Sequence, residues 1–145
     1  MSYQLFIIPI IAALIAQGLK LALDGIKGNF DFMHLISEYG GMPSSHTAFV
    51  ISLATMIALK EGMASSAFAI SLIMALIVIR DAIGFRRTLG KQSKTLNYIV
   101  RELSEEKKRE HLPKLPEEIG HNPLEVFVGG LLGLSISLLA NLLLK

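Results

Sequence analysis

The sequence has no cysteine among its 145 residues, and its charge is nearly balanced, with 14 Lys and Arg against 12 Asp and Glu. Without cysteine, neither a disulfide framework nor a thiolate metal site can form. The net charge of +2 is too small to indicate a partner by itself, and we expect no nucleic acid, metal or cofactor to be bound. Apolar residues make up 52% of the chain and the charged residues are bunched, which is typical of an integral membrane protein.

Four apolar segments predict membrane-crossing helices. Residues 3–23 and 124–144 have the length of about 20 residues that a bilayer core requires. The second segment, 47–59, has only 13 residues and needs 43–46 to approach that length, and the third is 64–79. No basic residue precedes the first segment, so we interpret it as a retained helix rather than a signal peptide.

The charged stretch after the third segment carries apolar residues at helical spacing. This pattern predicts a surface helix from roughly Lys91 to His111, ended by Pro113 and Pro116. The expected fold is therefore an all-α polytopic membrane bundle of about four transmembrane helices and one cytoplasmic or interfacial helix. We expect one membrane-embedded domain over residues 1–145.

Four crossings bring polar clusters from distant parts of the chain to one membrane face. The end of the first helix, the start of the second, the end of the third and the start of the fourth meet there. Of the Lys and Arg residues, all but Lys60 and Lys145 fall on this face. Basic residues of short loops stay in the cytoplasm, so we expect this face to be cytoplasmic and the protein to lie in the cell inner membrane.

Residues 40–47, Gly-Gly-Met-Pro-Ser-Ser-His-Thr, open the second apolar segment. The first N–H groups of a helix are unpaired and attract anions. With Ser44, Ser45 and His46 beside them, they predict a phosphate site at the membrane boundary. The alternative for His46 is a buried structural histidine.

The fourth segment begins at Asn122-Pro123-Leu124-Glu125, which predicts Asn122 as N-cap and Glu125 as the acid three residues later. Glu125 is either a capping acid or the partner of His121, and the two roles are compatible. Gly129 and Gly133 permit close helix packing, within the chain or across a homodimer.

Two histidines, an acid and several cations on one face can transfer a phosphoryl group without a metal. One histidine attacks phosphorus, the other protonates the leaving alkoxide, and a carboxylate orients the attacking imidazole. Two charged positions have alternatives. Lys20 either extends to the interface or binds the anion; Asp81 either pairs with Arg80 or holds a divalent cation with the phosphate.

Residues 42–46, Met-Pro-Ser-Ser-His, resemble the second motif of the type 2 phosphatidic acid phosphatases, Pro-Ser-Gly-His. The whole chain resembles the small divergent branch of that superfamily, which is related to the vanadium haloperoxidases. The first motif of the family is a lysine, six residues and Arg-Pro; here Lys20 is followed after six residues by Lys27-Gly28.

In the third motif, His121 and Glu125 keep the spacing from histidine to acid, and Leu115 stands where the family has an arginine. We expect Arg86 or Arg87 to supply that charge. The resemblance implies hydrolysis of a lipid phosphate monoester, glycerophospholipid or polyprenyl, through a phosphohistidine.

By the resemblance, His121 is the nucleophile, Glu125 its orienting acid and His46 the general acid. The phosphate ligands are then Lys20, Lys27, Ser44, Ser45, Arg86 and Arg87, with Arg80 and Asp81 nearby. A protein that binds or transports lipid phosphate without hydrolysis is the alternative, and a scaffold that has lost catalysis is a third.

Overall fold

A computed structural model describes residues 3–26, 41–102, 114–117 and 119–144. Over these residues the chain is helical and contains no β-strand. The elements are α1 (Tyr3–Ile26), α3 (Ser45–Glu61), α4 (Ser66–Arg80), the π-helix η1 (Asp81–Phe85), α5 (Arg86–Glu102) and α7 (Pro123–Leu143). The all-helical class predicted from the sequence is confirmed.

In the part of the chain that the structure describes, three helical stretches are long and apolar enough to cross a membrane: Tyr3–Leu23, Ser66–Glu102 and Pro123–Leu143. Their large apolar side chains face outward; Phe6, Ile77 and Leu139, for example, are 70%, 62% and 58% exposed. Such a surface is compatible with lipid rather than water. The expected second crossing is α3, which has 17 residues and is therefore shorter than each of these three stretches. The structure thus supports three spans by length and leaves the fourth as a prediction.

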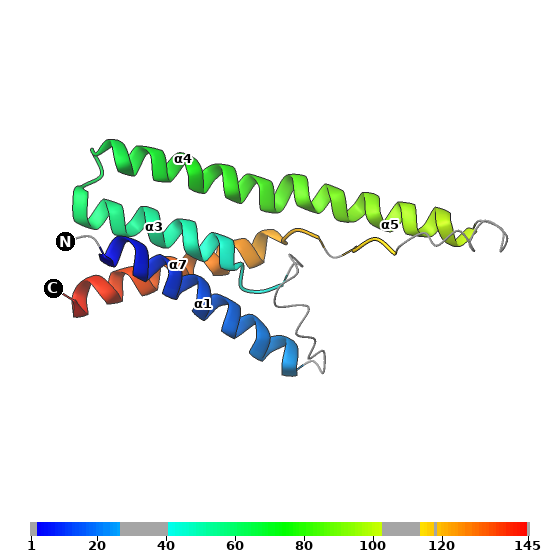
Figure 1. Ribbon diagram of the computed structural model, residues 1–145, viewed down its shortest axis with the longest axis horizontal. Helices are drawn as coiled ribbons and strands as arrows, with labels where there is room; N and C mark the ends of the chain where they lie inside the picture. Colours follow the sequence, from blue (N-terminus) through cyan, green and yellow to red (C-terminus); the bar gives the residue numbers. More distant parts are fainter. Residues whose placement is uncertain (1–2, 27–40, 103–113, 118, 145) are drawn as a thin grey trace.

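The surface helix predicted from roughly Lys91 is present as part of α5, but α5 begins earlier, at Arg86, and is continuous with the helix before it. α4, η1 and α5 follow one another without an interruption from Ser66 to Glu102, and α5 extends beyond the end of the bundle (Figure 1). The helix does not end at Arg80 and Asp81, because the π-helix η1 begins at Asp81 and leads directly into α5. Asp81 and Arg86, five residues apart, form an ion pair of 2.7 Å along this turn. The predicted continuation toward His111 lies outside the described residues.

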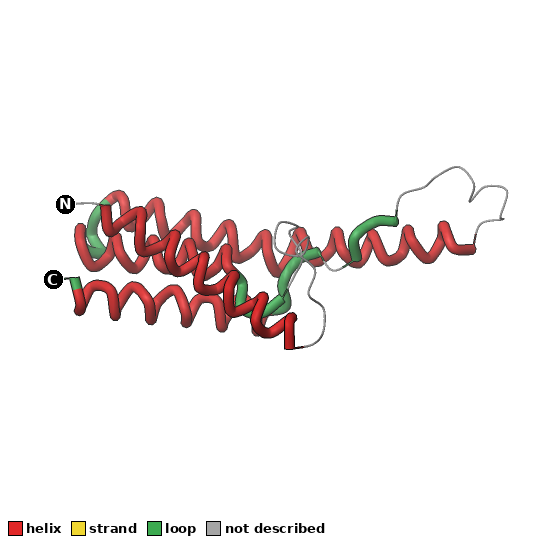
Figure 2. Tube along the Cα trace, turned by 60° about the horizontal axis from the view of Figure 1, so that its bottom comes forward, coloured by secondary structure: helices red, strands yellow, loops and turns green. Residues whose placement is uncertain are grey.

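Helix α3 packs against α1, α4 and α7 and lies between α4 and the other two (Figure 1). The helices of the bundle run side by side, with both termini at one end (Figure 2). Small side chains let the helices approach closely; Ala12 and Ala16 of α1 and Ala48 of α3 are completely buried. On α7, a Cβ atom added to Gly129 would overlap the carbonyl oxygen of Ser44, and one added to Gly133 would overlap that of Ala48. The Gly-x-x-x-Gly pair therefore packs α7 against α3 within the chain.

A hydroxyl pair joins the same two helices farther from the α3 start. Ser52 and Ser137 are completely buried, and their Oγ atoms lie 2.7 Å apart. The Ser137 hydroxyl is also within 3.2 Å of the Ser52 carbonyl oxygen. Such interhelical hydrogen bonds fix the register of the two helices, because apolar contact alone does not favour one register over another in lipid.

The chain reverses so that four polar clusters meet at one end of the bundle. The end of α1, the start of α3, the end of α4 and the start of α7 lie at this end, and both termini lie at the other (Figure 1). The convergence predicted from the topology is therefore observed.

Candidate active site at the starts of α3 and α7

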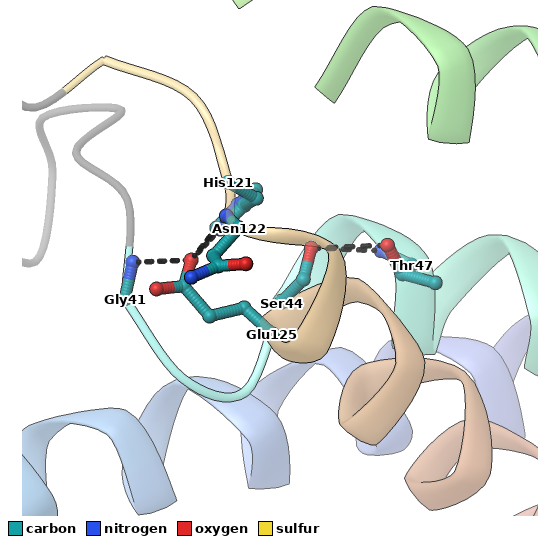
Figure 3. A network of polar contacts seen from close by, with 6 residues as sticks. All are labelled: Gly41, Ser44, Thr47, His121, Asn122 and Glu125. Atoms are coloured by element: carbon teal, nitrogen blue, oxygen red, sulfur yellow. Dashed lines mark hydrogen bonds and ion pairs between the residues drawn. The ribbon is translucent and has the colours of Figure 1, made fainter. Parts of the chain in front are cut away.

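The carboxylate of Glu125 is the centre of a hydrogen-bond network at this end (Figure 3). Its Oε2 atom accepts from the backbone N–H of Gly41 at 3.1 Å and from that of Asn122 at 3.1 Å, and it lies 2.9 Å from Nδ1 of His121. An ionised carboxylate oxygen suits such a position, because it only accepts hydrogen bonds. Glu125 thereby joins the segment before α3 to the segment before α7.

The start of α7 has the predicted geometry. Asn122 is the N-cap, Pro123 is the first helical residue and Glu125 accepts the N–H of the N-cap. This contact is the acidic half of a capping box. Glu125 therefore caps α7 and contacts the His121 ring at the same time, so the two alternatives considered for this residue are both realised.

The segment before α3 is held between α1 and α7. Gly41 has φ of +138°, a conformation that favours glycine, and a Cβ atom there would lie 2.7 Å from Cε of Lys20. Lys20 is only 6% exposed. Its side chain is thus enclosed beside Gly41, next to the Glu125 network, rather than extended into the interface.

The start of α3 is bonded directly to the start of α7. The Ser44 N–H donates to the carbonyl oxygen of Glu125 at 3.1 Å. The Ser44 hydroxyl is completely buried and accepts from the N–H and the hydroxyl of Thr47, at 3.4 and 3.0 Å. Ser44 is therefore the N-cap of α3, and any bond to a phosphate must share this hydroxyl. Ser45 is half-buried and His46 is exposed in the first turn of α3.

The π-helix positions His121 from the other side. The His121 N–H donates to the carbonyl oxygen of Ala82 at 3.0 Å, and π turns commonly occur at functional sites because they alter the regular helical hydrogen bonds. Gly120 has φ of +92°, and a Cβ atom there would lie 2.5 Å from the backbone nitrogen of Arg87. The backbone before His121 therefore lies against the first turn of α5.

Ala82, Gly120 and the π turn were not predicted. A glycine immediately before a candidate histidine was the one available signal, since glycine permits both a positive φ and close backbone approach. Nothing in the apolar pattern around Ala82 distinguishes a π turn from an α turn.

The cationic residues are placed unequally. Arg86 pairs with Asp81, with their side chains 29% and 41% exposed, where the sequence favoured a pair between Asp81 and Arg80. The backbone atoms of Arg86 and Arg87 lie beside Gly120. Lys27 lies outside the described residues. Within the described part, no three His, Asp or Glu side chains gather as a metal site.

Glu125→Gln separates capping from orientation of the histidine. Glutamine also serves as the third residue of a capping box, so α7 should remain folded. Its neutral amide does not stabilise a charged imidazole. For the phosphate release that the family resemblance implies, we therefore expect kcat to fall by about 10²-fold or more. Circular dichroism in detergent should be unchanged.

Glu125→Ala is the matched comparison, because it removes both roles and should also lower the thermal stability. If Glu125→Gln retained full activity, Glu125 would be a capping residue alone.

The fold and this site define an all-helical membrane protein with a histidine–carboxylate pair at one end of the bundle. Residues 1–136 match the family described as the Divergent PAP2 family, and the chain belongs to that family. The chain is 40% identical over 137 residues to the uncharacterized membrane protein YuiD of Bacillus subtilis (strain 168). The matched region covers 88% of this chain and 87% of YuiD. No solved structure matches this chain.

Proposed function

We propose that the protein hydrolyses a lipid phosphate monoester through a phosphohistidine on His121. The observation that carries this proposal is the 2.9 Å contact between Nδ1 of His121 and Glu125. A proton on Nδ1 that is donated to the carboxylate leaves Nε2 deprotonated and available as a nucleophile. His121 has no second side-chain hydrogen bond to the part of the chain that the structure describes.

The proposed reaction has two steps. Nε2 of His121 attacks phosphorus, the bond from phosphorus to the ester oxygen breaks, and His46 gives a proton to the leaving alkoxide. In the second step, His46 takes a proton from a water molecule, which attacks the phosphorus of the phosphohistidine. The phosphorus–nitrogen bond then breaks and releases inorganic phosphate. Glu125 stabilises the positive charge on His121 in both steps.

The phosphoryl oxygens require positive charge and N–H donors. The start of α3 offers a helix N-terminus beside that of α7, since Ser44 and Glu125 are joined by a backbone hydrogen bond of 3.1 Å. We assign Lys20, Ser45 and the Arg86 and Arg87 stretch to this role, with Lys27 and Ser44 as further ligands. The relation to the PAP2 family supports the phosphatase class.

A lipid substrate follows from the location of the site at the ends of membrane helices. A phosphate at this end can react while its apolar tail remains in the bilayer. From the distribution of basic residues we propose that this face is cytoplasmic and that the membrane is the inner membrane.

The test is phosphate release in sealed membrane vesicles of both orientations. Phosphatidic acid and a polyprenyl phosphate are added to the outer leaflet of vesicles containing wild type or His46→Ala. We expect release from wild type only when the cytoplasmic face is outward, and a loss of about 10²- to 10⁴-fold in His46→Ala, the usual effect of a general acid.

Release from the opposite orientation would overturn the assigned side. Binding of the lipid phosphate without release in wild type would favour the alternative, a binding or transport protein that does not hydrolyse its ligand.

A further inference from the structure

An apolar groove runs down the bundle from the candidate site, between α3, α4 and α7. It has a volume of about 390 Å³, within the usual range of ligand pockets. Its walls include Thr47, Ile51, Ile79, Phe127, Gly130 and Leu134. The groove lies open on its outer side, where Phe127 and Leu134 are 62% and 38% exposed.

The upper end of the groove adjoins the Glu125 network. Thr47 lines the groove and donates its hydroxyl to Ser44, whose N–H is bonded to Glu125. Pro123 and Val126, which flank Glu125 on α7, line the groove as well. The lining of the groove therefore begins at residues adjacent to the Glu125 network, on both α3 and α7.

The length of the groove matches one membrane leaflet. It extends along α7 from Pro123 to Leu134, and eleven residues of helix rise about 16 Å. The hydrocarbon core of a bilayer is about 30 Å thick. The groove thus reaches from the membrane face to approximately the midplane.

Beyond Thr47, in the first turn of α3, the side chains that line the groove have no group that can form a hydrogen bond with a ligand. Thr47 supplies its one side-chain hydroxyl, which already donates to Ser44, and the other side chains are apolar. α4 and α7 belong to stretches apolar enough to span a membrane, so an occupant enters from the lipid. We propose that the groove binds one hydrocarbon chain of the phosphate-bearing lipid; this rests on the proposed function for the place of the phosphate.

Gly130 makes the groove accessible to experiment. A Cβ atom there would lie 3.7 Å from Cγ2 of Thr47 and 3.8 Å from Cγ1 of Ile51, which is ordinary van der Waals contact. The Cβ atom of a larger side chain at this position therefore meets side-chain atoms of α3 and not its backbone, and we expect the rest of that side chain to occupy the groove. Gly18 of α1 has nothing within 4 Å of its Cβ position and is a matched control.

The test compares Gly130→Leu and Gly18→Leu on hexadecyl phosphate and butyl phosphate. We expect Gly130→Leu to lower kcat/KM for the long chain at least about tenfold, because the leucine side chain takes the space in which the long chain packs beside the site. Release from butyl phosphate should stay at the wild-type rate, and Gly18→Leu should change neither. Equal losses on both substrates, or no loss on either, would overturn the proposal.

A second measurement does not depend on hydrolysis. A hexadecyl phosphate with a diazirine at mid-chain should label groove residues such as Leu131 and Ile79 after irradiation, and Gly130→Leu should remove this label. Labelling spread over the outer faces of α1 and α4 would overturn the proposal. If the wild type is labelled in the groove but releases no phosphate, the proposed hydrolysis fails and the chain-binding site stands.

Competition identifies the source of the chain. Displacement of the label by phosphatidic acid assigns an acyl chain, displacement by a polyprenyl phosphate assigns an isoprenoid chain, and displacement by neither contradicts the proposal. Because the protein has no cysteine of its own, Gly130→Cys provides a unique thiol. Disulfide-linked dimers of this variant in the membrane would show that a second copy covers the groove, which also contradicts the proposal.

Discussion

His121→Ala is expected to abolish phosphate release, lowering kcat by about 10³-fold or more, because no other described group occupies the nucleophile position beside Glu125. The wild type, mixed with radiolabelled substrate and quenched in alkali, should carry an acid-labile phosphoryl group. His121→Ala should carry none. The loss of phosphate release and the loss of the label should occur together, because the nitrogen that attacks phosphorus is the nitrogen that carries the label.

The variant must remain folded for this result to be informative. The His121 backbone N–H donates to Ala82, and alanine keeps this bond, so the segment before α7 should stay in place. His121→Gln provides a second control, because its amide can still contact Glu125 but forms no phosphoramidate of histidine type. Wild-type release by either variant would refute the assignment of the nucleophile, and a label on another residue would identify the correct one.

The arrangement of the helices could be predicted because it depends on long apolar runs. Runs of about 20 residues at 3–23 and 124–144 leave a membrane helix as the one satisfactory solution for the backbone, and crossing and returning places their polar ends together. The end of the third helix could not be predicted in the same way. Arg80 and Asp81 have the charge pattern of a helix end, but the helix continues through η1 into α5, where Asp81 pairs with Arg86.

The contact between His121 and Glu125 was predicted from the spacing of these residues in the family motif that the chain resembles. His121 and Glu125, four residues apart, meet across the N-cap of α7 because Asn122 and Pro123 fix the start of that helix. The contacts from other segments required tertiary structure. The N–H groups of Gly41 and Ser44 bond to Glu125 from 84 and 81 residues away in the chain, and sequence spacing carries no information on such pairs.

Gly129→Ala should both destabilise the protein and impair the site. Its Cβ would overlap the carbonyl oxygen of Ser44, a backbone atom that can move only with the start of α3. Overpacking of this kind costs about 1–3 kcal/mol, which outweighs the gain of about 1 kcal/mol in helix propensity from replacing glycine. Since Ser44 is bonded to Glu125, displacement of α3 should also lower kcat. Thermal unfolding in detergent and phosphate release measure the two effects.

Gly130→Ala is the matched control on the same helix, because its nearest contact would be an ordinary 3.7 Å to a Thr47 methyl group and the propensity gain remains. It should be as stable as the wild type or more so. Gly133→Ala is a second comparison, because its Cβ atom would overlap the carbonyl oxygen of Ala48, one helical turn farther from the site. We expect this variant to lose stability, with a smaller loss of activity than Gly129→Ala. If Gly129→Ala and Gly130→Ala unfolded at the same temperature, close contact between α7 and the start of α3 would not hold the two halves of the site together.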